Sequence, residues 1–255
     1  MLAHKEDPPY DREFYQGMVH GALRAARAIV PIVLANFPVR SAVDIGCGPG
    51  AWLHALEERD VTDIRGYDGD YVDRSTLLIE PGNFVPVDLC QDFAIDRTFD
   101  LAISLEVAEH IPERFAEPLI GRLVAAAPVV LFSAAIPGQF GVNHINLQWQ
   151  DYWRSIFRSL GFHPVDLIRP QVWGHPEVEY WYQQNIILYC GDAALRDNPQ
   201  LQPIPDNRTL NIVHPALYDA HLARSGRSLT TALRLLPSLA RDAARRRIKT
   251  LRSPP

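Results

Sequence analysis

Short apolar runs alternate with segments of helical periodicity over most of the chain. A short run rich in β-branched or aromatic side chains predicts a strand, whereas apolar residues that recur at every third or fourth position predict a helix. Six or seven strands are predicted, at 42–45, 63–67, 84–87, 99–104, 129–133, 164–169 and 185–190. Helices are predicted at 11–38, from Trp52 onward, at 113–126 and at 148–162. Strands that alternate with helices predict an α/β fold with one mostly parallel sheet.

The same patterns predict a body at residues 1–195 and an extension at 196–255. Within the body, the helix at 11–38 is predicted to cover the ligand cleft, with Pro31 kinking or dividing it. The composition shifts to Pro, Asn, Asp and Gln from 192 to 210, which predicts a linker without regular structure. Apolar positions from Leu236 onward then predict a basic amphipathic helix, with a solvated helix or frayed terminus as the alternative.

Charge is distributed unevenly between the body and the extension. The net charge is −5, but residues 221–255 hold nine basic side chains against one acid, which gives +8 there and −13 for the remainder. An acidic body is a poor surface for a nucleic-acid backbone and favours a small-molecule or sugar ligand. The basic segment is expected to contact a membrane surface or an acidic partner. With three widely spaced cysteines, no signal-peptide pattern and no apolar run of bilayer length, a cytoplasmic location is expected.

The glycine-rich stretch after the first predicted strand is the strongest candidate for ligand binding. It places Gly46, Gly48 and Gly50 at alternate positions before a helix, where backbone can approach a nucleotide closely. This spacing also satisfies the looser dinucleotide pattern, so an NAD-dependent oxidoreductase stays an alternative. Asp44 favours a different ligand, because its charge repels a pyrophosphate and attracts the ammonium and sulfonium groups of S-adenosylmethionine.

The order acid-x-Gly-x-Gly-x-Gly resembles the first motif of the class I S-adenosylmethionine-dependent methyltransferases. The resemblance implies a Rossmann-like seven-stranded sheet in the order 3-2-1-4-5-7-6, with helices on both faces, to which the periodicity of the last residues adds a helical C-terminal extension. Asp68 lies twenty positions after Gly48, the spacing at which an acid binds ribose hydroxyls. The resemblance also assigns Asp88 to the adenine amino group and Leu89 to the adenine ring. The expected cofactor-binding residues are Asp44, Gly46, Cys47, Gly48, Gly50, Asp68, Gly69, Asp88, Leu89 and Leu105.

A cluster of acids and histidines follows the fourth predicted strand. Glu106, Glu109 and His110 are spaced i, i+3 and i+4, so they share one face if the segment is helical, and His144 lies in the loop after the fifth strand. Two carboxylates and two imidazoles make a plausible site for Mg²⁺, Mn²⁺ or Zn²⁺. The pattern resembles the metal ligands of small-RNA terminal 2′-O-methyltransferases and ubiquinone-pathway O-methyltransferases. A Glu-His pair that is purely structural is the alternative.

The function predicted from these residues is methyl transfer from S-adenosylmethionine to a hydroxyl of a small molecule or sugar. A divalent ion would bind vicinal acceptor oxygens and lower the pKa of the attacked hydroxyl. Glu106 and His144 are the candidate catalytic residues, and His144 is the expected general base if there is no metal. Three alternatives stay open: a terminal RNA 2′-O-methyltransferase that uses the basic extension, an NAD-dependent oxidoreductase, and a non-catalytic binding module with a cofactor fold.

Overall fold

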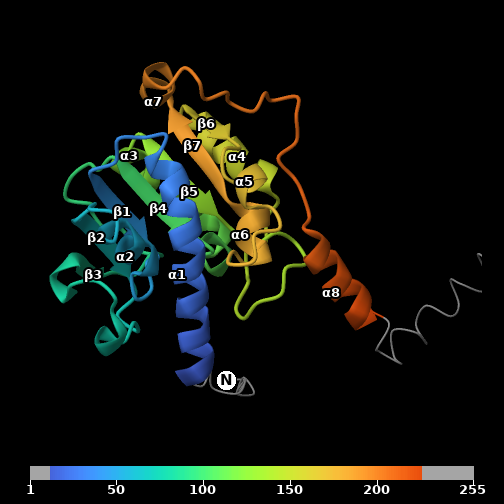
Figure 1. Ribbon diagram of the computed structural model, residues 1–255, viewed down its shortest axis with the longest axis horizontal. Helices are drawn as coiled ribbons and strands as arrows, with labels where there is room; N and C mark the ends of the chain where they lie inside the picture. Colours follow the sequence, from blue (N-terminus) through green and yellow to red (C-terminus); the bar gives the residue numbers. More distant parts are fainter. Residues whose placement is uncertain (1–11, 226–255) are drawn as a thin grey trace, which may run out of the picture. The chain divides into compact units, whose positions relative to one another are not determined.

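Seven strands form one sheet in the computed structural model of the chain, which describes residues 12–225 (Figure 1). The strands are β1 (Ser41–Ile45), β2 (Asp63–Asp68), β3 (Phe84–Pro86), β4 (Leu101–Leu105), β5 (Val129–Ser133), β6 (Phe162–Val165) and β7 (Ile187–Gly191). Their order is β3-β2-β1-β4-β5-β7-β6. Strands β1 to β5 pair in parallel, and β7 is antiparallel to both β5 and β6. This order confirms the predicted Rossmann-like methyltransferase topology.

Helices cover both faces of the sheet. The α-helices of the first unit are α1 (Arg12–Leu34), α2 (Ala51–Glu57), α3 (Ala116–Ala126), α4 (Gln150–Ser159), α5 (Arg169–Val172), α6 (Tyr180–Asn185) and α7 (Asp192–Asp197), and the second unit contains α8 (Pro215–Ser225). Successive strand residues point to opposite faces. In β4, Leu101 and Ile103 therefore join the apolar cluster of α1 and α2, whereas Ala102 joins that of α3 and α4. Helix α1 crosses in front of the sheet in Figure 1. The result is one sheet between two helical layers.

Several predicted boundaries differ from those of the structure. Helix α1 continues through Pro31 to Leu34 instead of dividing there. Because Pro31 lies in the last helical turn, it removes only one backbone donor before the helix ends. The final predicted strand, at 185–190, is displaced to Ile187–Gly191, and Asn185 instead ends helix α6. That difference places Asn185 at the carboxyl edge of the sheet, beside the candidate site.

The contacts divide the chain into two compact units, with the first ending at Ile212 and the second beginning at Val213. The linker predicted at 192–210 therefore belongs with the first unit, as does the start of the predicted extension up to residue 212. The buried Arg169 guanidinium binds both carboxylate oxygens of Asp166 at 2.8 and 2.7 Å and also donates to the backbone oxygen of Leu210 at 2.9 Å. Such bonds fix this segment although it has little regular structure.

Most of the basic extension lies beyond residue 225, so the amphipathic helix expected from Leu236 onward lies outside the described residues. Between residues 12 and 225, no helix combines the length and the apolar character that crossing a membrane requires.

Candidate site at the carboxyl edge of the sheet

The turn after β1 is packed against the protein on two sides and open at its centre. Gly46, Gly48 and Gly50 have φ values of 86°, 52° and 90°, a region that side chains disfavour. A Cβ on Gly46 would lie 2.4 Å from a methyl group of Val107, and one on Gly50 would lie 2.9 Å from Ile79. A Cβ on Gly48 would meet nothing within 4 Å. The open position is therefore the one at which a ligand can approach the backbone.

Two buried acids flank this turn. Asp68, at the end of β2, accepts hydrogen bonds from the backbone N–H groups of Gly48 and Gly69, each at 2.6 Å, and from the Tyr71 hydroxyl. Asp44 is only 2% exposed, and its burial, with a smaller contribution from the Asp68 charge, raises its pKa well above the usual range. The structure thus brings both acids and the glycine turn together, as the sequence predicts.

The other expected cofactor residues differ in their surroundings. Leu105 is buried at the end of β4. Cys47 is buried beside Gly66, its thiol donates to the Gly48 carbonyl at 3.3 Å, and burial raises its pKa. Beyond β3, the exposed Asp88 side chain accepts the backbone N–H of Cys90 at 2.8 Å, and Leu89 packs on the apolar cluster of α3 and α4. Contact of Asp88 and Leu89 with adenine therefore remains a prediction.

Glu109, His110 and His144 form a second group at this edge. One potential ligand atom from each residue lies within 4.8 Å of the other two. His144 Nε2 is 4.0 Å from Glu109 Oε1, and the two imidazole centroids are 4.9 Å apart. Among the described residues, neither carboxylate oxygen of Glu109 has a hydrogen-bond partner, although the side chain is buried. A buried carboxylate without a partner is costly, so this group suits a cation.

Backbone contacts between two loops hold these three residues together. The carbonyl oxygen of Glu109 accepts the N–H groups of Ile145 and Asn146 at 2.9 and 3.0 Å. His110 Nδ1 lies 3.3 Å from the carbonyl oxygen of Asn143, a distance that fits a donated hydrogen bond. The His144 ring occupies the space that a side chain on Gly141 would need. The loop after β5 is therefore fixed against the residues that follow β4.

The protonation preferences of the group also suit a metal ion. Burial, with a smaller contribution from the Glu106 charge, raises the pKa of Glu109 well above its usual range. Burial lowers the pKa of His110 and of His144, and His110 lowers that of His144 further. Neutral imidazoles are the form that binds metals, and a cation would in turn favour the ionised carboxylate. The residues present therefore fit a divalent ion with nitrogen and oxygen ligands.

Glu106 lies outside this group. Its φ of 55° reverses the chain after β4, and only Ala108–His110 form a short 3-10 helix, so the expected shared helical face is absent. The Glu106 carboxylate instead accepts Gln139 Nε2 at 2.7 Å and Asn185 Nδ2 at 3.1 Å. Three of the four expected metal ligands are brought together, and the fourth is held by amides.

Sequence reasoning missed these carboxamides. Gln184 completes the network by donating to Gln139 Oε1 at 3.3 Å and to Asn185 Oδ1 at 2.9 Å. The available signal was the run Gln183-Gln184-Asn185 immediately before an apolar strand. Adjacent carboxamides just before a buried strand need partners, and an acid after another strand of the same sheet can supply them.

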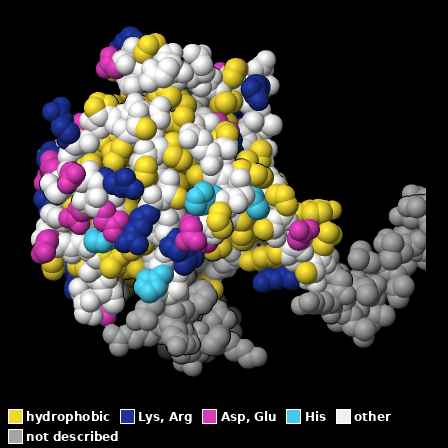
Figure 2. All heavy atoms as spheres, in the orientation of Figure 1, with side chains coloured by type: hydrophobic (Ala, Val, Ile, Leu, Met, Phe, Trp, Pro, Cys, Tyr) yellow, Lys and Arg dark blue, Asp and Glu magenta, His cyan; other side chains and the backbone are white. Residues whose placement is uncertain are grey.

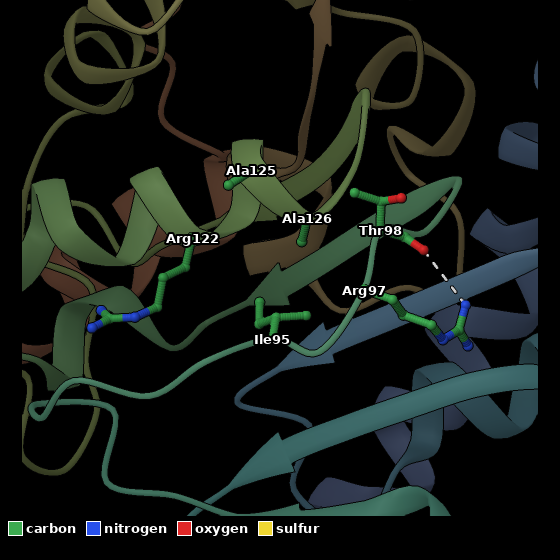
Figure 3. Close-up of a pocket in the computed structure, with 6 residues that line it drawn as sticks. All are labelled: Ile95, Arg97, Thr98, Arg122, Ala125 and Ala126. Carbon is green, nitrogen blue, oxygen red and sulfur yellow. Dashed lines mark hydrogen bonds between the residues drawn. The ribbon is translucent and has the colours of Figure 1, made fainter.

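A pocket between the loop before β4 and the end of α3 is lined by Ile95, Arg97, Thr98, Arg122, Ala125 and Ala126 (Figure 3). It lies at the amino end of β4, opposite the edge that carries Gly48 and Glu106. Acidic and basic side chains are interspersed on the face of the first unit shown in Figure 2.

Three solved structures have a similar fold. Neither a protein-family model nor a curated protein matches the sequence. DesVI from Streptomyces venezuelae is 14% identical, with 74% of this chain and 100% of that chain covered and a TM-score of 0.53. The sugar N-methyltransferase KedS8 from Streptoalloteichus sp. is 15% identical, with 75% and 99% covered and a TM-score of 0.52. The amino pentose methyltransferase CalS10 from Micromonospora echinaspora is 13% identical, with 73% and 99% covered and a TM-score of 0.52. At these identities the likeness establishes the fold.

Proposed function

We propose that this chain is an S-adenosylmethionine-dependent methyltransferase that acts on a hydroxyl of a small molecule or sugar. The observation that carries the proposal is a set of carboxyl groups around the glycine turn that no basic side chain compensates. Asp44 and Asp68 are buried there, and Asp44 and Glu106 both act on the Tyr182 hydroxyl. Within residues 12–225 no Lys or Arg side chain forms an ion pair with any of the three. Burial raises the pKa of Asp44 and of Glu106, and a bound cation would favour their ionised forms. Buried carboxylates of this kind favour a ligand that carries positive charge.

This charge separates the two candidate cofactors. S-adenosylmethionine has a sulfonium and an ammonium group, whereas a nicotinamide dinucleotide has a pyrophosphate that the same carboxylates would repel. In the proposed complex, the cofactor lies over the open Gly48, and Asp68 binds its ribose hydroxyls. For that, the ribose must share or replace the hydrogen bond that the Tyr71 hydroxyl now makes with Asp68.

In the proposed complex the acceptor lies beside Glu109, His110 and His144, and these three residues would hold a divalent ion. Such an ion supplies a Lewis acid that lowers the pKa of a bound hydroxyl. A mixed carboxylate and imidazole site of this kind favours an acceptor that offers oxygen atoms. The methyl group passes from the sulfonium sulfur to the acceptor oxygen, the carbon–sulfur bond breaks to leave the neutral thioether, and the hydroxyl proton passes to solvent water. Without the ion, the neutral imidazole of His144 is the group that accepts this proton.

The fold neighbours are compatible with an acceptor of this size. KedS8 is described as a sugar N-methyltransferase and CalS10 as an amino pentose methyltransferase. In this chain, the histidine and carboxylate group supports transfer to oxygen rather than nitrogen.

Metal binding and methyl transfer are tested separately. Calorimetric titration of chelator-treated protein with Mn²⁺ should show one site that is lost in Glu109→Gln and His144→Ala and retained in His20→Ala, a control on the exposed side of α1. Transfer of labelled methyl from S-adenosylmethionine to a panel of sugars and vicinal diols should stop after chelation and return with Mg²⁺, Mn²⁺ or Zn²⁺. Turnover unchanged by chelation would remove the metal from the proposal but leave the transferase.

A further inference from the structure

The carboxylate of Glu106 is the end point of a directed hydrogen-bond network. Gln184 donates to the side-chain oxygens of Gln139 and Asn185, Asn185 donates to Gln139, and both Gln139 and Asn185 donate to Glu106. In these contacts, the side-chain oxygens of Gln139 and Asn185 already accept hydrogen bonds. All donors therefore run toward Glu106, and none of these contacts offers an acceptor for a protonated Glu106.

This direction favours the ionised form of Glu106. Burial raises the pKa of its carboxyl group, and the hydrogen bonds from Asn185, Ser133 and Gln139 lower it. A carboxylate has only acceptor sites, which suit these donors, whereas a neutral carboxylic acid would place its own hydrogen against an amide donor. Its backbone is fixed as well, because the Glu106 N–H donates to the Ser133 carbonyl at 3.0 Å and to the Ser133 hydroxyl at 3.1 Å. The negative charge thus has a defined position.

That position is beside the glycine turn. In the sheet register Asp44 pairs with Ile103, which sets the end of β4 level with the turn that follows β1. Val107, the residue after Glu106, fills the space beside the Cα of Gly46. The buried Tyr182 hydroxyl lies within the electrostatic influence of both Glu106 and Asp44, which contribute with its burial to a raised pKa. Two strands therefore present carboxylates to the same region.

We propose that Glu106 is a specificity-determining residue that distinguishes S-adenosylmethionine from S-adenosylhomocysteine, and that Gln139 and Asn185 are its positioning residues. This inference rests on the proposed function. The two ligands differ at sulfur, which is a sulfonium cation before transfer and a neutral thioether afterwards. A fixed anion beside the turn stabilises only the charged sulfur. Loss of that charge on transfer weakens the attraction and favours release of the product.

The test compares the dissociation constants of both ligands by calorimetry, with no acceptor present. In Glu106→Gln, which keeps the size and the acceptor oxygen of the side chain, the affinity for S-adenosylmethionine should fall about tenfold while that for S-adenosylhomocysteine changes little. Gln139→Leu removes one donor and should shift the ratio in the same direction by a smaller factor. The control Glu117→Gln removes an exposed carboxylate on α3 and should leave both constants unchanged.

The ratio of the two constants separates this role from a structural one. A side chain that only maintains the fold would weaken both ligands together, so parallel losses or an unchanged ratio in both Glu106→Gln and Gln139→Leu would overturn the inference. That result would leave the proposed function standing if the wild-type protein binds both ligands. Wild-type protein that binds neither ligand would overturn the proposed function and the inference with it.

Discussion

Replacing Gly46 or Gly48 of the turn after β1 by alanine should affect stability and ligand binding to different extents. Both Gly46 and Gly48 have positive φ, so either substitution forces an alanine into the left-handed region, at a cost of about 1–2 kcal/mol. The two positions differ in their surroundings. The Gly46→Ala methyl group would lie 2.4 and 2.7 Å from the two methyl carbons of Val107, whereas the Gly48→Ala methyl group would meet no protein atom within 4 Å.

These distances set the expected magnitudes. Overpacking against Val107 adds about 1–3 kcal/mol, so Gly46→Ala should lower the free energy of unfolding by about 2–5 kcal/mol. Gly48→Ala should lower it by only about 1–2 kcal/mol. In a protein of this size, each kcal/mol corresponds to roughly 2–4 °C in Tm. Gly48→Ala, however, places a methyl group where the cofactor approaches, and its affinity for S-adenosylhomocysteine should fall at least about tenfold.

The assay combines urea unfolding, followed by circular dichroism, with calorimetric titration of S-adenosylhomocysteine on each folded variant. The free energies of unfolding compare the two packing environments, and the dissociation constants compare the two positions as ligand contacts. Equal stability of the two variants would refute the packing argument. Wild-type affinity in Gly48→Ala would refute the assignment of the open turn to the cofactor.

Three further substitutions test other parts of the account. Burial raises the pKa of Glu109, so the metal-free folded protein retains a proton that the unfolded chain releases, and stability should fall as pH rises above about 4.3, the ordinary glutamate value. Glu109→Gln should reduce this fall of the unfolding free energy with pH. In urea unfolding at neutral pH it should also stabilise the metal-free protein by about 1–3 kcal/mol. A pH dependence equal to that of the wild type would contradict the cost of burying the Glu109 carboxylate. Asp68→Asn should weaken binding of S-adenosylhomocysteine by about 1.5–3 kcal/mol through loss of charge-assisted bonds, and calorimetry that shows wild-type affinity would argue against ribose recognition there. Arg169→Met should cost about 3–5 kcal/mol of unfolding free energy, because it leaves the partly buried Asp166 carboxylate without its partner and frees the Leu210 carbonyl; a Tm within a degree or so of wild type would contradict this.

The positions of the strands were predictable from sequence because each apolar run is short, rich in β-branched residues and followed by a turn or helix, whereas their order in the sheet followed from the resemblance of the glycine motif. The glycine turn and Asp68 were predictable for the same reason, since local spacing places both at strand ends. The structure confirms that these two segments meet, with the Asp68 carboxylate on the Gly48 N–H. Local sequence was sufficient to place the residues that directly follow a strand.

The surroundings of Glu106 could not be predicted in this way. Helical spacing grouped it with Glu109 and His110, but its positive φ turns the chain before a helix can form. Its partners, Gln139 and Asn185, lie 33 and 79 positions away in the sequence, and no periodicity connects them. Contacts of this kind depend on how strands β4, β5 and β7 pack side by side, which is a property of the assembled sheet.

The acidic carboxyl edge is expected to bind a sulfonium cofactor rather than a dinucleotide. Calorimetric titration of the wild-type protein with S-adenosylmethionine, S-adenosylhomocysteine and NAD tests this expectation directly. We predict saturable binding of the first two ligands and none of NAD. Binding of NAD with no binding of either adenosyl ligand would contradict the interpretation of Asp44 and Glu106, and with it the proposed methyl transfer.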